Sequence, residues 1–166
     1  MKKGFTMIEL IFVIVILGIL ASVAIPRLAA TREDSEISAT VANLRTLVSD
    51  ATAYYTAKGE FGSTTKWSEI TNVPLSGATA TVTTATGGKL KAGGKDCITV
   101  QLIEKATTDG KTTPAHIVFT TTNADSGVCK QVVESAPVKV YLDSTLPGDT
   151  TNATGKMAIG SSTSVY

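Results

Sequence analysis

The sequence is poor in the residues that carry most catalytic and metal-binding chemistry. Among 166 residues it has one histidine and two cysteines, and aromatic residues make up only 5%. Cys97 and Cys129 have neither the C-x-x-C spacing nor the neighbouring histidines of a zinc site. The net charge of +1 gives no basic excess of the kind that nucleic-acid binding requires. The composition therefore disfavours both a zinc protein and a nucleic-acid-binding protein.

The single histidine offers little for catalysis. His116 lies beside Ile117 and Val118 in an apolar stretch, and no nucleophile or second base accompanies it. The aspartates stand singly near expected turns, and none follows the spacing of a calcium-binding loop. We therefore expect a protein that is not an enzyme and needs no metal, no cofactor and no small-molecule substrate.

The two cysteines allow two interpretations. In an exported domain, Cys97 and Cys129 would form a disulfide, and closing the loop between them would stabilise the fold by about 3–4 kcal/mol. In the cytoplasm they would be unpaired buried thiols. We favour the disulfide because the N-terminal sequence indicates export.

A long apolar run begins close to the N-terminus. Residues 5–25 hold a single charge, Glu9, and as a helix they would measure about 31 Å, which matches the hydrocarbon core of a bilayer. Lys2 and Lys3 precede the run, so the positive-inside rule keeps that end in the cytoplasm and sends the rest of the chain across the membrane.

A conventional signal peptide is the alternative interpretation of this run. Ser22-Val23-Ala24 resembles a small-residue cleavage site, and cleavage would then follow Ala24. Two features argue against it: Glu9 interrupts the apolar region, and the helical pattern continues through the proposed cut.

The helical pattern extends well past the apolar run. Apolar residues at alternating spacings of four and three predict one buried helix face, made of Ile37, Val41, Leu44, Val48, Ala51 and Tyr55. Charged residues, Glu36 and Asp50 among them, fall off this stripe and are expected to face solvent. We predict one helix from Phe5 to about Ala57 that ends before Gly59, with a kink at Pro26.

The remainder of the sequence, residues 60–166, is rich in threonine, glycine and β-branched residues, which predicts a sheet. Turn-forming pairs such as Gly93-Gly94 separate the expected strands. These strands are Ala80–Ala85, Cys97–Ile103, His116–Thr122, Val128–Glu134 and Val138–Leu142, with a short one around Lys156–Ile159.

The N-terminal residues also carry a family resemblance. Lys2-Lys3-Gly4 followed by Phe5-Thr6-Met7-Ile8-Glu9 and an apolar helix resembles the prepilin leader and cleavage site of type IV pilins and type II secretion pseudopilins. The resemblance implies cytoplasmic cleavage between Gly4 and Phe5 by a prepilin peptidase, which also methylates the new Phe5 amine. Glycine suits such a site because it lets a protease approach the backbone closely.

Glu9 is the residue for which a function is most strongly indicated, because a carboxylate in a membrane-spanning segment is costly. No lysine or arginine lies near it in the mature helix, so the cationic Phe5 amine is its best partner. The resemblance implies that the amine comes from a neighbouring subunit of a filament. The alternative is a carboxylate that reaches the cytoplasmic headgroups.

We therefore predict a pilin-like α+β fold, in which a long N-terminal helix packs on an antiparallel sheet. The expected parts are a leader (1–4), a transmembrane and filament-core helix (5–25), its amphipathic continuation (26–59) and a β-rich globular head (60–166). The expected function is that of a homopolymeric filament subunit, assembled by an inner-membrane platform from a pool held in membrane lipid with the head in the periplasm. The alternative is a membrane-anchored or signal-peptide-cleaved periplasmic binding domain that never polymerises.

Overall fold

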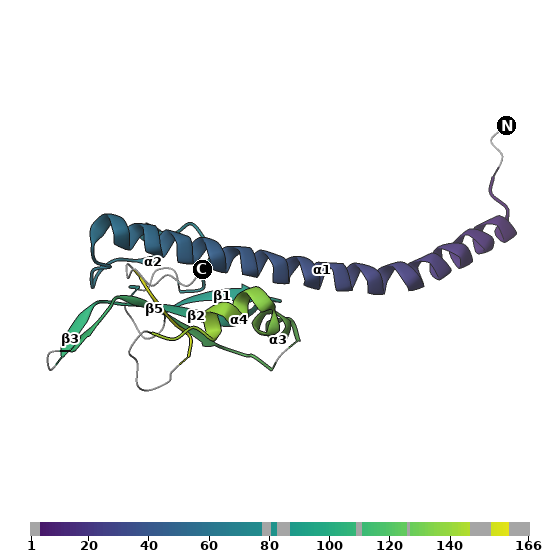
Figure 1. Cartoon of the computed structure of the whole chain (residues 1–166). Coiled ribbons are helices and arrows are strands. Elements are labelled where there is room, and N and C mark those ends of the chain that lie inside the picture. The colour runs from purple at the N-terminus through teal and green to yellow at the C-terminus, as the bar shows by residue number, and fades with distance from the viewer. Residues whose placement is uncertain are drawn as a thin grey trace. The chain divides into compact units, whose positions relative to one another are not determined.

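The structure, a computed structural model, describes residues 4–77, 81–82, 87–108, 111–125, 127–146 and 154–159, apart from the side chains of Ala29, Thr108 and Lys111. The chain divides into two compact units, residues 1–35 and 36–166. A single helix, α1 (Met7–Lys58), runs through both (Figure 1). The observed class is α+β, as the sequence predicted.

Helix α1 begins two residues later and ends one residue later than predicted. Gly59 follows its last residue with φ +79°, the left-handed conformation that commonly ends a helix and that glycine adopts without strain. Pro26 lies inside the helix, where it removes one backbone hydrogen bond. The kink at Pro26 stays a prediction.

The second unit is built on a four-stranded antiparallel sheet. Its strands are β1 (Gly88–Ala92), β2 (Lys95–Ile103), β5 (His116–Thr121) and β6 (Lys156–Ala158), in the order β1-β2-β5-β6. The predictions of β2, β5 and β6 are confirmed. The sequence analysis missed β1 and a separate hairpin, β3 (Ala106–Thr108) and β4 (Lys111–Thr113). Most of the predicted strand Ala80–Ala85 lies outside the described residues.

Two predicted strands are wrong, because both segments are helices. Residues Val128–Glu134 lie in α3 (Gly127–Glu134), and Val138–Leu142 lie in α4 (Ala136–Leu142); a further short helix, α2 (Trp67–Ile70), was not predicted. The valines suggested strands, but the helical spacing of three in α3 buries Cys129 and Val132 together. In α4 a proline occupies the first turn, the one part of a helix where its missing N–H costs nothing.

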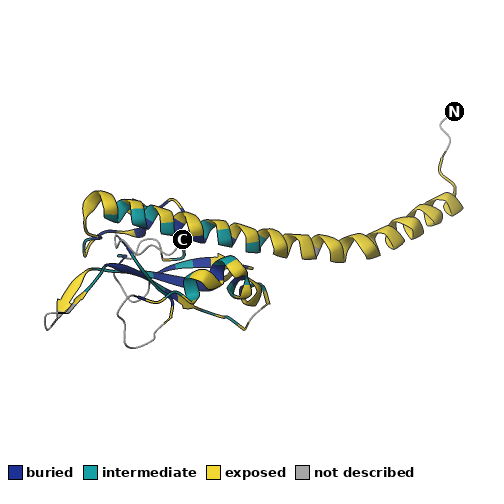
Figure 2. Ribbon diagram, in the orientation of Figure 1, coloured by how far each residue is buried: buried dark blue, intermediate teal, exposed yellow. Residues whose placement is uncertain are grey.

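The core is formed by the sheet and the second half of α1, together with Cys129 and Val132 of α3 and Val138 of α4 (Figure 2). The centre of the buried helix face runs through Thr40, Leu44, Leu47 and Ala51, each at most 2% exposed. Most of the predicted stripe, such as Val41 and Val48, lies to one side of this line and is only partly buried. Leu44 and Ala51 were placed correctly, whereas Leu47 was not anticipated.

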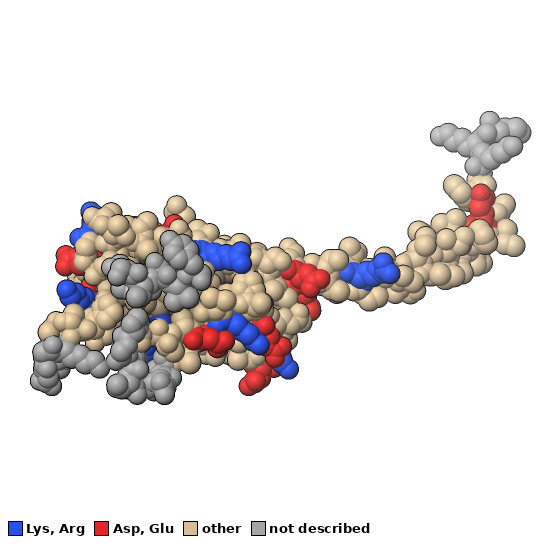
Figure 3. Space-filling model, viewed as in Figure 1, with Lys and Arg blue, Asp and Glu red and all other residues tan. Residues whose placement is uncertain are grey.

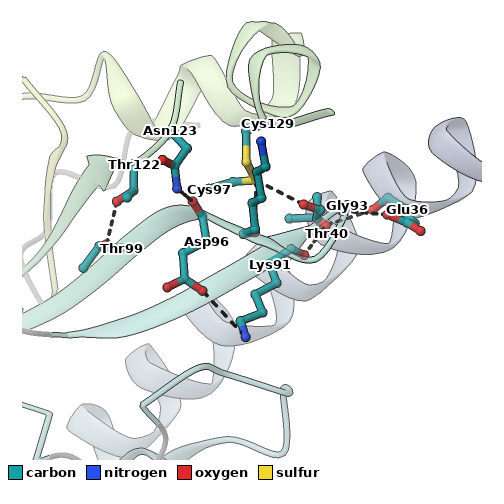
Figure 4. Close-up of a disulfide and its surroundings, with 12 residues drawn as sticks. Glu36, Thr40, Lys91, Gly93, Asp96, Cys97, Thr99, Thr122, Asn123 and Cys129 are labelled. Carbon is teal, nitrogen blue, oxygen red and sulfur yellow. Dashed lines mark hydrogen bonds and ion pairs between the residues drawn. A yellow bond between two sulfur atoms is a disulfide. The ribbon is translucent and has the colours of Figure 1, made fainter. Parts of the chain in front are cut away.

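Two carboxylates predicted to face solvent instead join α1 to the rest of the second unit. Glu36 Oε2 accepts a hydrogen bond of 2.6 Å from the Gly93 N–H, in the turn between β1 and β2 (Figure 4). Asp50 Oδ2 accepts one of 2.6 Å from the Thr71 hydroxyl. Because Gly93 and Gly94 both have positive φ, this tight turn needs glycine at its centre. The turn was predicted, but its carboxylate contact was not.

A third carboxylate, Glu104, fixes the turn that follows α1. Its Oε1 atom accepts hydrogen bonds from the backbone N–H groups of Phe61 and Gly62. A charged acceptor that binds two backbone donors is among the stronger hydrogen-bonding arrangements in proteins. The turn after α1 is thereby held to the end of β2.

The predicted pairing of Cys97 and Cys129 is present as a disulfide that joins β2 to α3 (Figure 4). The two Cα atoms are 5.1 Å apart and 32 residues separate them in sequence, while both residues are at most 1% exposed. The bond closes a loop that contains β5 and nearly all of β2, the two central strands of the sheet. It therefore restricts the unfolded chain over these two strands.

Removing this disulfide is expected to lower the free energy of unfolding of the second unit by about 3–4 kcal/mol, because the unfolded chain regains the entropy of an open loop. Urea unfolding of the detergent-solubilised chain, followed by Trp67 fluorescence with and without reductant, measures the loss. The Cys97→Ser/Cys129→Ser variant is the control and should not respond to reductant. An unchanged midpoint for the reduced wild type would contradict the prediction.

Candidate processing and assembly segment

The predicted cleavage site lies in an accessible, non-helical stretch. Gly4, Phe5 and Thr6 precede α1, and the Phe5 side chain is 84% exposed. No other part of the described structure comes within 4 Å of a Cβ placed on Gly4. The Gly4–Phe5 bond therefore lies in backbone that is neither helix nor strand and that is open to approach. Lys2 and Lys3, which the sequence analysis used for orientation, lie outside the described residues.

Thr6 and Glu9 form the N-terminal cap of α1. The Glu9 N–H donates to Thr6 Oγ1 at 3.3 Å, and the Thr6 hydroxyl lies 3.5 Å from Glu9 Oε2. The spacing is that of a capping box, in which a threonine precedes the helix and a glutamate occupies its third position. The sequence analysis missed this role, although Thr6-Met7-Ile8-Glu9 matches the pattern T-x-x-E. The carboxylate also lies in the first helical turn, where the helix dipole favours negative charge.

The first part of α1 is exposed along its whole circumference. Every described side chain from Gly4 to Ser35 is exposed, and the large apolar ones range from 41% exposed at Ile16 to 84% at Phe5 (Figure 2). By length and composition, α1 is the one described helix that could cross a membrane, and none of its apolar window is buried. A signal sequence near an N-terminus meets the same criterion.

Two hydroxyl groups in the first part of α1 donate hydrogen bonds within their own helix. The Ser22 hydroxyl donates to the Ile19 carbonyl at 2.7 Å, and the Thr31 hydroxyl donates to the Leu28 carbonyl at 3.0 Å. Such local bonds leave no hydroxyl unpaired when a helix enters an apolar environment. Glu9 is therefore the one ionised group that α1 would carry into a membrane before Pro26.

The head offers no second candidate site among its described residues. Its histidine, His116, is 6% exposed, and its Nδ1 atom lies 2.9 Å from the Pro114 carbonyl oxygen, so it is a buried strand residue. No group of three or more histidine, cysteine, aspartate or glutamate side chains in the described part of the chain could hold a metal ion. The predicted residues Gly4, Phe5 and Glu9 thus lie together at the start of α1, whereas Cys97 and Cys129 lie in the head.

The long helix packed on an antiparallel sheet defines a pilin-like α+β fold. Residues 1–25 match the family described as the prokaryotic N-terminal methylation motif. This match supports the type IV pilin and pseudopilin family, and with it the chain carries the N-terminal signature of a pilin-like prepilin, a structural rather than enzymatic type of protein. No curated protein and no solved structure matches the chain.

Loss of the Thr6 hydroxyl should loosen the first turn of α1. A cap of this kind contributes about 1 kcal/mol, so Thr6→Ala is expected to speed hydrogen exchange at the Glu9 amide about fivefold. Thr6→Ser keeps the hydroxyl and should exchange as the wild type does. The comparison is made by NMR in detergent micelles, and equal exchange in the alanine variant would show that the cap does not form.

Proposed function

We propose that the chain is a membrane-anchored prepilin that is cleaved between Gly4 and Phe5, methylated at the Phe5 amine and polymerised through α1 into a type IV filament. The observation that carries the proposal is the N-terminal methylation motif on residues 1–25, in a chain whose large apolar side chains on α1 from Met7 to Leu28 are all exposed. Exposed apolar surface of this extent marks an interaction site. Lipid covers it before assembly, and equivalent helices of other subunits cover it in the filament.

The proposed anchor places Lys2 and Lys3 in the cytoplasm and the head in the periplasm of the bacterial inner membrane. The prepilin peptidase, which is also the methyltransferase, then has access to the Gly4–Phe5 bond from the cytoplasmic side. An assembly platform in the same membrane extracts the mature subunit. Processing after Ala24 is disfavoured because the residues on both sides of that bond lie in the interior of α1.

In the proposed filament, Glu9 pairs with the methylated Phe5 amine of a neighbouring subunit. Within one chain the amine lies four residues before Glu9 and outside the helix, and the Glu9 carboxylate lies near the Thr6 hydroxyl. A neighbour displaced along the filament axis can bring its amine to the outer side of the carboxylate. The two charges compensate each other in the apolar filament core, which neither could enter alone at low cost.

The filament is either a type IV pilus or a type II secretion pseudopilus. Both use the same N-terminal segment, so α1 does not distinguish them. A gene for a retraction ATPase beside the gene for this chain would favour the pilus.

One prediction of this proposal concerns processing. The mature chain should begin with a methylated Phe5, because the Gly4–Phe5 bond is exposed outside the helix and lies within the motif. Intact-protein mass spectrometry of the membrane fraction measures this. A mature chain that begins at Ile25 would establish conventional signal-peptide cleavage and remove the filament proposal.

The second prediction separates the charge of Glu9 from its capping role. Glu9→Gln keeps a side chain that suits the third position of a capping box but removes the negative charge. An incoming amine would then lack its partner in the filament core, and breaking a buried pair in this way costs about 3–5 kcal/mol. Both Glu9→Gln and Glu9→Ala should therefore reduce filament yield by at least tenfold.

The measurement is the ratio of sheared filament to membrane pool, with cleavage followed in parallel. Membrane insertion should not suffer, since removing a carboxylate from hydrocarbon makes insertion easier by about 2–3 kcal/mol. Wild-type filament yield from Glu9→Gln together with a loss in Glu9→Ala would show that Glu9 acts only as a helix cap. Wild-type yield from both would show a carboxylate that merely reaches the headgroups.

A further inference from the structure

A short charged stretch follows the apolar run of α1 (Figure 3). It holds Arg27, Arg32, Glu33 and Asp34, all of them exposed and all in the first unit. The side chains of Arg27 and Asp34 make no hydrogen bond or ion pair with any described residue, whereas Arg32 has an interaction of its own. Two opposite charges seven residues apart on a bare helix are therefore available to a partner.

Helical geometry places these two charges on the sides of α1 that the proposed filament contact uses. With about 100° per residue, Asp34 lies within about 20° of Glu9 around the helix, and Arg27 follows Glu9 by five full turns and so lies on the same side. Glu33 lies about 120° away from Glu9. Asp34, and not Glu33, therefore faces the same neighbour as Glu9.

The axial shift that the Phe5–Glu9 contact requires also brings Arg27 of one copy close to Asp34 of the next. Bringing the Phe5 amine of one copy level with Glu9 of the next requires a shift of about 6–8 Å, because Phe5 lies just before the first turn of the helix. Arg27 lies about 10.5 Å before Asp34, so the same shift leaves an axial gap of about 2.5–4.5 Å between them. The arginine side chain is long and flexible enough to cross that gap. One displacement therefore satisfies both pairs.

We propose that Arg27 of one copy of the chain pairs with Asp34 of the adjacent copy, as a second contact that sets the axial register of the filament. This inference rests on the proposed filament function and names the partner surface of the first unit as α1 of a second copy. The Glu9 pair lies at one end of the apolar run and the Arg27–Asp34 pair lies just beyond its other end. Between them the helix is uncharged and would slide freely without the two fixed points.

The competing explanation is that Arg27 only anchors the helix among lipid headgroups, as arginine near the end of a membrane helix often does. In that case the amount of chain held in the membrane depends on the charge of Arg27, and the effect of changing Arg27 does not depend on the charge of Asp34. The two explanations therefore differ in whether the effects of the two residues depend on each other.

A charge exchange tests the proposal in cells that process and assemble the wild-type chain. Arg27→Glu places two carboxylates together and Asp34→Lys places two cations together, so each should reduce the ratio of sheared filament to membrane pool about tenfold. Arg27→Glu/Asp34→Lys restores opposite charges and should recover the ratio to within about threefold of wild type. The matched control, Arg27→Glu/Glu33→Lys, has the same net charge but the lysine on another side of the helix, and should stay low.

The outcomes separate the inference from the proposed function. Filaments from wild type, but no recovery in the exchanged double variant, would overturn the Arg27–Asp34 pair and leave the filament function standing. Equal recovery with Glu33→Lys, or wild-type yield from both single variants, would also overturn the pair. A wild-type chain that is processed but forms no filament would overturn both proposals. Amounts of membrane-inserted chain, measured in the same samples, show whether any loss is one of insertion.

Discussion

The apolar surface of α1 between Met7 and Leu28 is the constraint on which the rest of the molecule depends. Its large side chains are all exposed, and no described residue of the first unit covers them. Such a surface costs free energy in water in proportion to its area, so the chain must keep it in lipid or against other protein. In lipid there is little hydrophobic gain from joining two helices, because acyl chains are as apolar as leucine. Polar contacts must then determine the axial position of one helix relative to the next. The few ionised groups on α1 therefore have more influence than their number suggests.

Glu9 can act both in the isolated chain, as part of the helix cap, and in the proposed filament, as an acceptor for a neighbour's amine. In the isolated chain its backbone N–H and its carboxylate both lie against Thr6, and together they complete the first turn of the helix. A carboxylate that already accepts from a hydroxyl keeps lone pairs for a further donor. The cap thus holds the carboxylate in a defined position without saturating it, and a defined acceptor is what a cationic amine from a neighbour would require.

The sequence predicted those features that depend on local pattern. The apolar run, the end of α1 at Gly59, the alternating strand β2 and the strand β5 followed from residue type and spacing, whereas the disulfide was expected because the N-terminal sequence indicates export. The failures have a common cause in tertiary contact. Val128 and Val138 were assigned to strands on their β propensity, but burial of one helical face outweighs preferences below about 1 kcal/mol per residue. Glu36 and Asp50 were assigned to solvent because their partners, Gly93 and Thr71, lie in distant parts of the sequence. The Thr6 cap and the proline in the first turn of α4 did have local signals, which were overlooked.

Among the interior positions of α1, Pro26 lies where the loss of a backbone hydrogen bond is expected to cost least. It has no N–H, so the carbonyl of Ser22 loses its helical donor. In hydrocarbon an unpaired carbonyl costs several kcal/mol, whereas at the edge of the membrane water or headgroups can supply a donor. The apolar run ends at Ile25 and the first basic side chain, Arg27, follows the proline directly. A proline one or two turns earlier would place the unpaired carbonyl deep in lipid, and one two or more turns later would approach the segment in which Thr40 and Leu44 are buried against the head. The position of Pro26 is thus bounded on one side by the bilayer and on the other by the core.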